Sequence, residues 1–127
     1  MIAAAYSLTP EIVKLLLDKG ADLETRDNLD LTPLMNAAAF SATSEIGKLL
    51  LDKGAELEAR SKNGWTPLMI AARWCNNSEI ILWLLDNGAD ATAENKLGKK
   101  VIFYARDNNK ALEDTRALER LEQLAGE

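Results

Sequence analysis

LTPLMNAA at residues 31–38 is followed by a near copy, WTPLMIAA, at residues 65–72, and these two stretches decide the fold. A second phrase accompanies them in three versions: LLLDKGAD at 15–22, LLLDKGAE at 49–56 and WLLDNGAD at 83–90. Both phrases recur every 34 residues. A fixed period of this length predicts stacked repeat units, each of which buries its apolar side against the next.

The Thr-Pro pair predicts the start of the first helix in a unit. A threonine side chain caps the first backbone N–H groups of a helix, and proline at the first helical position loses no hydrogen bond. Two such starts occur, at Thr32–Pro33 and Thr66–Pro67. Pairs of alanines follow at 37–38 and 71–72, and these small side chains let a neighbouring helix approach closely.

The second helix of each unit is expected to begin at a cap residue and to end at a glycine. The predicted caps are Thr9, Thr43 and Asn77, each followed two residues later by a glutamate that suits the positive end of the helix dipole. In the first unit the spacing puts Ile12, Val13, Leu16 and Leu17 on one face. Glycine then ends the helix because it adopts the left-handed conformation without strain. Asn63–Gly64 predicts a turn at the tip of the return loop.

These residues together resemble the ankyrin repeat. The pattern is Thr-Pro-Leu-Met-x-Ala-Ala followed by Glu-Ile-x-x-Leu-Leu-x-x-Gly-Ala, and it covers nearly the whole chain. The resemblance implies an all-α fold, an ankyrin-type α-solenoid of stacked helix-turn-helix units with β-hairpin-like loops. We expect a single domain over 1–127, with units at about 1–30, 31–64, 65–98 and 99–127.

The chain departs from the family pattern in two ways. Met35 and Met69 stand where the family usually has histidine, and the sequence contains no histidine at all. The hydrogen bonds that this histidine usually makes are therefore absent or replaced. The units are also one residue longer than is usual, and the extra residue falls in the turn between the two helices, around 39–44 and 73–78.

The two ends of the chain differ from the middle. Met1 aligns with Met35, so the first unit begins inside its own first helix. Two explanations stay open, a longer array that starts upstream and a gene that begins here. The last unit loses Thr-Pro, and its final helix is expected over 111–124. Its leucines are predicted to face inward, at Leu112, Leu118 and Leu121, and its charged residues outward, at Arg116, Glu119, Arg120 and Glu122. Such a polar outer face predicts a C-terminal cap.

The resemblance implies that loop tips and first helices line a concave surface that binds protein partners. Residues that differ between units there include Leu31, Trp65 and Lys99 before the Thr-Pro position, and Tyr6, Phe40, Trp74 and Asn108 at the end of the first helix. An exposed aromatic row is typical of binding hot spots. Alternatively, these aromatic side chains fold over the lengthened turn as local packing. The candidate partner-binding residues are Tyr6, Leu29, Leu31, Phe40, Lys62, Asn63, Trp65, Arg73, Trp74, Lys96 and Lys99.

Charge changes along this surface. The first loop holds Asp27 and Asp30, whereas basic residues follow at Lys62, Arg73, Lys96 and Lys99. We expect a partner protein whose matching surface is acidic and carries an apolar knob, because complementary charge steers encounter and fixes register. The alternative is an ordinary solvated face.

Trp83 takes the position of Leu15 and Leu49, and Leu82 beside it replaces a lysine. Gly47 in the preceding unit leaves room, so we expect Trp83 to fill space near Gly47. The alternative is weak self-association of an otherwise monomeric protein through Leu82 and Trp83.

Composition limits the remaining functions. The 127 residues carry 15 basic and 20 acidic side chains, a net charge of -5, so neither nucleic acid nor membrane is expected as a partner. Cys75 is the one cysteine, which excludes an internal disulfide. No apolar run reaches membrane-spanning length, and MIAAAYSL has no basic region typical of a signal peptide, so we expect a cytoplasmic protein.

The sequence predicts no enzyme. Without histidine, a serine or cysteine nucleophile has no imidazole base. Acidic residues recur once per unit, as cap and surface roles require, whereas an active site would occur once. No phosphate loop, calcium loop or metal-ligand spacing occurs, so no cofactor or metal is expected. We predict a non-catalytic protein–protein interaction module that binds its partner through the concave face. The alternative is a structural fragment of a longer repeat array or a self-associating scaffold.

Overall fold

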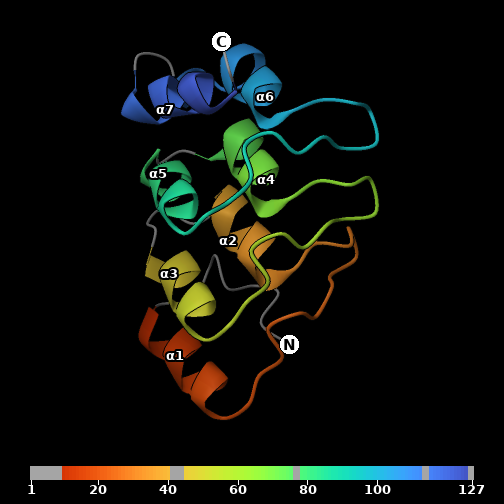
Figure 1. Ribbon diagram of the computed structural model, residues 1–127. Helices are drawn as coiled ribbons and strands as arrows, with labels where there is room; N and C mark the ends of the chain where they lie inside the picture. Colours follow the sequence, from red (N-terminus) through yellow and green to blue (C-terminus); the bar gives the residue numbers. More distant parts are fainter. Residues whose placement is uncertain (1–9, 41–44, 76–77, 113–114, 126–127) are drawn as a thin grey trace.

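A computed structural model describes residues 10–40, 45–75, 78–112 and 115–125. The helices in these segments are α1 (Pro10–Asp18), α2 (Pro33–Phe40), α3 (Glu45–Asp52), α4 (Pro67–Trp74), α5 (Glu79–Asp86), α6 (Val101–Asn108), the short 3₁₀ helix η2 (Lys110–Leu112) and α7 (Arg116–Leu124). Figure 1 shows α2, α4 and α6 stacked in one row and α1, α3, α5 and α7 in a second row. The predicted all-α solenoid is confirmed.

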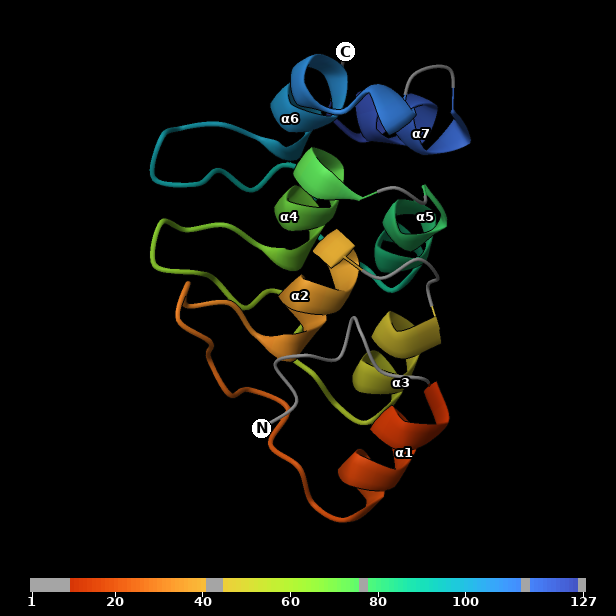
Figure 2. The same cartoon turned by 180° about the vertical axis from the view of Figure 1, so that it is seen from behind.

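The loops between successive units project to one side of the stack. The first loop (residues 19–32), the second loop (53–66) and the third loop (87–100) run side by side in both views (Figures 1 and 2). We call this the loop side of the molecule. The second helices form the opposite side, and the core lies between the two rows of helices.

The caps predicted at Thr32 and Thr66 are confirmed. The Met35 N–H donates to Thr32 Oγ1 at 3.3 Å, and the Met69 N–H donates to Thr66 Oγ1 at the same distance. Both threonines are buried, so each cap pairs a backbone group that water cannot reach. The alanine pairs are buried as well, where α2 packs against α4 and α4 against α6.

Met35 supplies a hydrogen-bond acceptor at the position where the family usually has histidine. The backbone N–H of Thr32 donates to Met35 Sδ at 3.5 Å, and both residues are buried. A thioether is a weak acceptor, but it spares this N–H from being buried without a partner. Met35 and Met69 are fully buried, so the flexible methionine side chain also fills the space between successive first helices.

The same turn closes each loop. A backbone N–H to carbonyl bond joins Asp27 to Leu31 at 3.0 Å, Ser61 to Trp65 at 2.9 Å and Asn95 to Lys99 at 3.0 Å. In each turn the residue just before the carbonyl acceptor has positive φ: Asp30 (64°), Gly64 (83°) and Gly98 (74°). Glycine adopts this conformation freely, and aspartate is among the few other residues that tolerate it. The turn predicted at Asn63–Gly64 is confirmed.

Arginines join each loop to the next. Arg26 Nη1 donates to the carbonyl oxygen of Arg60 at 2.7 Å and to that of Asp30 at 3.2 Å. One unit later, Arg60 Nη1 donates to the carbonyl oxygens of Glu94 at 2.6 Å and Gly64 at 3.1 Å. Because each guanidinium bonds its own turn and the following loop, the three loops are held in a fixed register.

Trp83 occupies the space beside Gly47, as predicted. A Cβ built on Gly47 would lie 3.9 Å from Trp83 Cζ3 and 3.0 Å from Ile80 Cδ1. Trp83 is partly buried and packs against the main core cluster. Ile80 thus lies closest to the space that the absent Gly47 side chain leaves, and Trp83 lies beside it.

The prediction for the final helix was wrong at its start. The chain forms the 3₁₀ turn η2 first, and α7 begins only at Arg116 because Thr115 caps it, with the Leu118 N–H donating to Thr115 Oγ1 at 3.2 Å. Leu112 and Leu121 are buried as expected. Arg120 and Glu122 do not only face water: Arg120 pairs with Asp86 on α5 and Glu122 with Arg106 on α6, each at 2.7 Å.

Two other sequence expectations concern the second helices. Thr9, Thr43 and Asn77, the predicted caps, lie outside the described residues. Ile12 is 46% exposed, whereas its counterparts Ile46 and Ile80 are each 4% exposed. The expected buried stripe is thus incomplete on α1 and complete on α5, where Ile80, Ile81, Leu84 and Leu85 are all buried.

Candidate protein-binding surface

A groove opens on the loop side between the first two loops and the helices α2 and α4. It has a volume of about 420 Å³ and is lined by Leu29, Leu31, Ala39, Ser61, Asn63, Trp65, Ile70 and Trp74. We call it the central groove. Five of its lining residues are candidates from the sequence: Leu29, Leu31, Asn63, Trp65 and Trp74. The repeat register brings them together from three elements that are distant in the chain.

Aromatic rings form one wall of the central groove. The ring centroids of Trp65 and Trp74 lie 5.2 Å apart with an interplanar angle of 34°, and Trp65 lies 4.3 Å from Tyr104 on the next first helix. Tyr104 is buried, Trp65 is half-buried and Trp74 is 44% exposed. The stack thus runs from the core to the solvent. Tilted rings at these distances fix one another's orientation, so Trp74 is held in place while it remains accessible.

Leu29 faces the aromatic wall from the first loop, and it is 73% exposed. Its backbone N–H donates to Asp27 Oδ1 at 2.9 Å, and the N–H of Leu31 donates to the same oxygen at 3.0 Å. The loop that carries Leu29 is therefore ordered by polar bonds to Asp27. Those bonds and the one from Asn36 lower the pKa of Asp27 although its burial alone would raise it.

A polar link between a loop and the first helix that follows it is present at the first and third loops and missing at the second. Asn36 Nδ2 donates to Asp27 Oδ2 at 2.9 Å, and Asn95 Nδ2 donates to Tyr104 Oη at 2.7 Å. Both links span nine residues. The same two positions at the second loop and on α4 are Ser61 and Ile70, and both line the central groove. The short serine and the apolar isoleucine leave this part of the surface hollow and apolar.

The basic candidates are not among the residues that line the groove. Lys62, Lys96 and Lys99 are exposed, and Arg73 is half-buried with its Cζ 5.1 Å from the ring centroid of Trp74. Lys99 Nζ lies 4.4 Å over the ring of Phe103. These cation–π contacts keep positive charge next to aromatic surface.

Two aromatic candidates cannot be placed. Tyr6 lies outside the described residues, and so does the side chain of Phe40, whose backbone ends α2. Trp74 therefore represents the predicted aromatic row in the described part of the chain. It contacts Trp65 and is also open to solvent, so local packing and exposure coexist at this position.

Sequence reasoning missed the residues that shape the groove from below. Ala39 and Ile70 form its floor, and Tyr104 holds Trp65 from behind. The signal for Ser61 and Ile70 was in the sequence, because the aligned pairs in the neighbouring units are polar at both positions. The signal for Tyr104 was not, since its partner Trp65 is 39 residues away and lies in a different kind of element.

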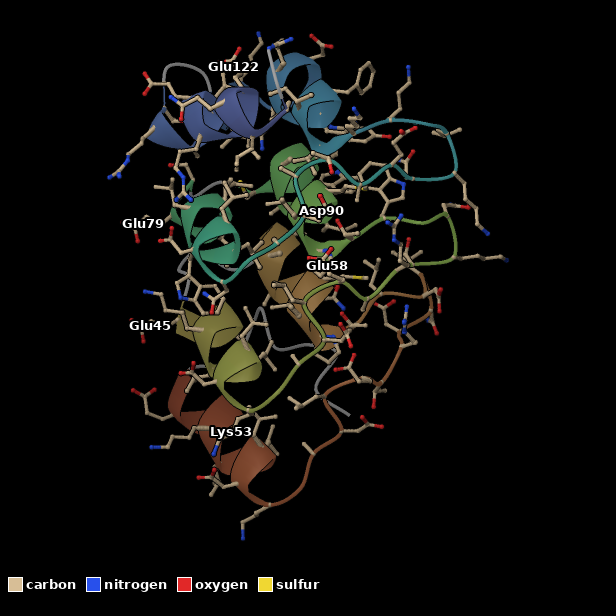
Figure 3. All side chains as sticks on the ribbon, viewed as in Figure 1. Glu45, Lys53, Glu58, Glu79, Asp90 and Glu122 are labelled. Atoms are coloured by element: carbon tan, nitrogen blue, oxygen red, sulfur yellow. The ribbon has the colours of Figure 1, made fainter. Side chains whose placement is uncertain are left out.

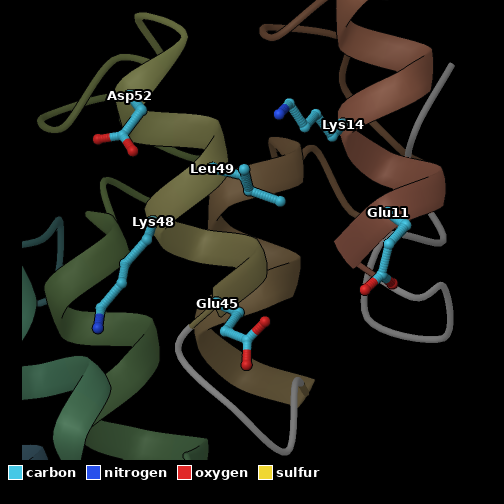
Figure 4. A pocket seen from close by; sticks show the side chains of 6 residues that line it. All are labelled: Glu11, Lys14, Glu45, Lys48, Leu49 and Asp52. Carbon is cyan, nitrogen blue, oxygen red and sulfur yellow. The ribbon is translucent and has the colours of Figure 1, made fainter.

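A second hollow, of about 290 Å³, lies between α1 and α3 on the side away from the loops. Figure 4 shows Leu49 directed toward α1, with charged side chains around it. The charges are of both signs, from Glu11, Lys14, Glu45, Lys48 and Asp52. Positive and negative groups partly cancel, and Leu49 is the one apolar side chain among the residues that line this hollow.

A pair of acidic residues lies between the second and third loops (Figure 3). Glu58 Oε2 accepts the backbone N–H of Asp90 at 3.0 Å. Partial burial, together with the charge of Asp90, raises the pKa of Glu58. Hydrogen bonds from the side chain and backbone of Thr92 lower the pKa of Asp90. The bond between Glu58 and Asp90 thus joins two loops, but it holds Glu58 in a partly buried place that disfavours the ionised carboxylate. Among the described residues, no group of three or more cysteine, aspartate or glutamate side chains could hold a metal ion.

The fold and this surface define the chain as a helical repeat solenoid with an apolar groove on its loop side. Its repeat is that of a known family, since the family described as ankyrin repeats, in three copies, matches residues 1–95. The chain belongs to the ankyrin repeat family. Ankyrin repeats are generally protein–protein interaction modules and are typically non-catalytic. No curated protein matches the sequence. No helix in the described segments is both long enough and apolar enough to cross a membrane.

Proposed function

We propose that the chain is a non-catalytic interaction module that binds a partner protein through the central groove and the loop tips beside it. The supporting observation is that Leu29 and Trp74 remain 73% and 44% exposed while facing a common hollow. Contact with a partner would remove these apolar side chains from water, and tryptophan in a groove is typical of binding hot spots.

The partner is expected to present an acidic surface with an apolar projection. Lys62, Lys96 and Lys99 are exposed on the loop tips although the protein carries a net charge of -5. These positions on the second and third loops therefore differ in sign from the molecule as a whole. Attraction across such an interface speeds encounter and fixes register, and salt weakens it.

Affinity capture from a native lysate tests the proposal. The bait is the full chain as wild type, as Trp74→Ala and as Lys48→Ala, a change on the side away from the loops. Trp74 is preferred to Trp65 because Trp65 also packs against the buried Tyr104, so its removal would damage the fold. We expect one protein to be recovered with the wild type and Lys48→Ala but depleted at least about tenfold with Trp74→Ala. Equal recovery with all three baits would refute the use of the loop side.

Self-association is a second candidate function, and the exposed face of α1 favours it. Leu15 is 55% and Ile12 46% exposed there. The packing of Trp83 beside Gly47 gives less support to self-association through Leu82 and Trp83. We propose a monomer, for which sedimentation would give one concentration-independent species. A dimer that Leu15→Ser disrupts would support the second candidate instead.

A further inference from the structure

The central groove lies at the second loop, where the polar link of the neighbouring loops is absent. At the first and third loops a side chain of the loop bonds a side chain of the first helix that follows, as Asn95 does with Tyr104 at 2.7 Å. At the second loop Ser61 Oγ accepts the backbone N–H of Trp65 at 3.2 Å, a bond that Asp27 and Asn95 also make in their loops. Ile70, however, presents hydrocarbon where the other two helices present a polar side chain. The combination of a short serine with an isoleucine is thus particular to the second loop.

The size and lining of the groove fit one large apolar side chain with its adjoining backbone. Its volume of about 420 Å³ lies at the lower end of the range of ligand pockets. Leu29 and Trp74 form opposite walls, and the buried Ile70 lies at the base. Asn63 and Ser61 at the rim supply the few polar groups that a peptide backbone needs.

Charge around the groove is asymmetric. On the side of the third loop, the Lys96 N–H donates to the carbonyl of Asn63 at 3.0 Å, and Lys96 Cγ lies 3.4 Å from the Cβ position of Gly64. This lysine is therefore seated against the groove rim. The first loop instead carries two carboxylates. Asp27 accepts two backbone N–H groups, and Asp30 lies 3.8 Å from the guanidinium of Arg26.

We infer that the partner's binding segment is extended and acidic, that one large apolar side chain fills the central groove, and that its carboxylates lie toward the third loop. Carboxylates on that side meet Lys96 and Lys99, whereas on the opposite side they would meet Asp27 and Asp30. This inference rests on the proposed function and adds the sequence chemistry of the partner and its direction across the stack.

Selection of random peptides displayed against the immobilised full chain tests the composition. We expect enriched peptides to combine one leucine, phenylalanine or tryptophan with several acidic residues on one side of it. Their affinities are then measured by fluorescence anisotropy against a matched pair of variants, Leu29→Ser and Leu97→Ser. The two leucines share one repeat register and are 73% and 72% exposed, but Leu97 is not among the residues that line the groove. Leu29→Ser should weaken binding about tenfold, and Leu97→Ser less than about twofold.

The direction is tested with charge variants and a spin label. Lys96→Glu should weaken the selected peptides about tenfold at low salt and little at high salt, while Asp30→Asn should not weaken them. A nitroxide on the acidic end of the peptide should broaden amide signals of the third loop and spare those of the first.

Three outcomes would overturn the inference: enriched peptides without acidic residues, broadening in the first loop, or a second copy of the chain in the groove. If such peptides still depended on Leu29, the proposed function would stand. Peptides and captured partners that both ignored Leu29 and Trp74 would refute the proposed function as well.

Discussion

The guanidinium of Arg26 donates a hydrogen bond to the backbone carbonyl of Arg60, the residue one full repeat later, with Nη1 and the oxygen 2.7 Å apart. Arg60 repeats the contact with Glu94 at 2.6 Å. Arginine suits this position because its planar head offers several donors and can bond two carbonyls at once. The loop side therefore behaves as a connected surface, and its stability can be tested at these bonds.

Arg60→Ala should loosen the third loop. The substitution removes the bonds to the carbonyls of Glu94 and Gly64, and since they are exposed to solvent we expect a loss of about 1 kcal/mol in the free energy of unfolding. Urea denaturation measures the loss, and hydrogen exchange should accelerate at amides of residues 87–100. The exposed Lys62→Ala serves as control and should change stability by less than about 0.5 kcal/mol. Unchanged exchange in the third loop of Arg60→Ala would contradict the linking role.

Gly64→Ala should destabilise the protein more than Gly98→Ala. The two glycines share a register and have φ values of 83° and 74°, so an alanine is strained at both by about 1 kcal/mol. At Gly64 the added Cβ would also lie 3.1 Å from the backbone nitrogen of Lys96, whereas at Gly98 the nearest atom is Glu94 Oε1 at 3.8 Å. We expect an additional loss of about 1 kcal/mol at Gly64. Equal midpoints in urea would show that the two loops do not pack tightly there.

Asn109→Ala should be among the more damaging polar substitutions. Asn109 is buried, and its Nδ2 donates to the carbonyls of Ala72 at 2.9 Å and Cys75 at 3.1 Å, at the end of α4. Its removal leaves these buried carbonyls without that donor, at a cost of about 2 kcal/mol. Asn109→Asp provides a second comparison, because it keeps the size but replaces the donor with an acceptor. Thermal unfolding of both variants should show lower Tm values than the wild type, and a wild-type Tm for Asn109→Asp would exclude the donor role.

Glu58→Gln should stabilise the protein at neutral pH. The folded state raises the pKa of Glu58 above its ordinary value of 4.5, so ionisation opposes folding, and this loss of stability develops as the pH rises from 4.5 through the folded value. Glutamine cannot ionise, yet its amide oxygen can still accept the Asp90 N–H. The variant should therefore have the higher Tm near neutral pH, and its advantage should vanish below 4.5.

Glu24→Gln is the matched control for this pH effect. Glu24 Oε2 accepts the backbone N–H of Glu56 at 2.9 Å, one unit before the equivalent bond between Glu58 and Asp90, but Glu24 is exposed. Its substitution removes the same charge without relieving burial. A gain at neutral pH for Glu24→Gln as large as for Glu58→Gln would show that net charge, and not burial, sets the effect.

The helices and their caps could be predicted from the sequence because their causes are local. Thr66 caps a helix through a residue three positions away, and Gly64 takes positive φ within its own turn. The space beside Gly47 was also predictable from the aligned units. Gly47 lacks the side chain that its counterparts carry, and Trp83 in the next unit is larger than Leu49. The final helix was harder, because Thr115 competes with the preceding residues for the start and only the fold decides between them.

The candidate surface was predictable in part for the same reason. Residues that differ between units, such as Leu29 and Trp74, stand out in an alignment of the repeats, and both line the groove. The arginine bonds between loops were not predicted, although Arg26 and Arg60 share a register, because their acceptors are backbone carbonyls that leave no mark in the sequence.

The pair Ser61 and Ile70 also indicates how a repeat protein can acquire a binding site for a new partner. Because the groove lies at the loop where the two-residue polar link is absent, its position along the stack depends on which loop lacks that link. Replacing Asn95 and Tyr104 with serine and isoleucine, and introducing a polar pair at positions 61 and 70, would move the groove from the second loop to the third while the helices stayed as they are. A binding site of this kind can change its position along the chain without any change in the fold.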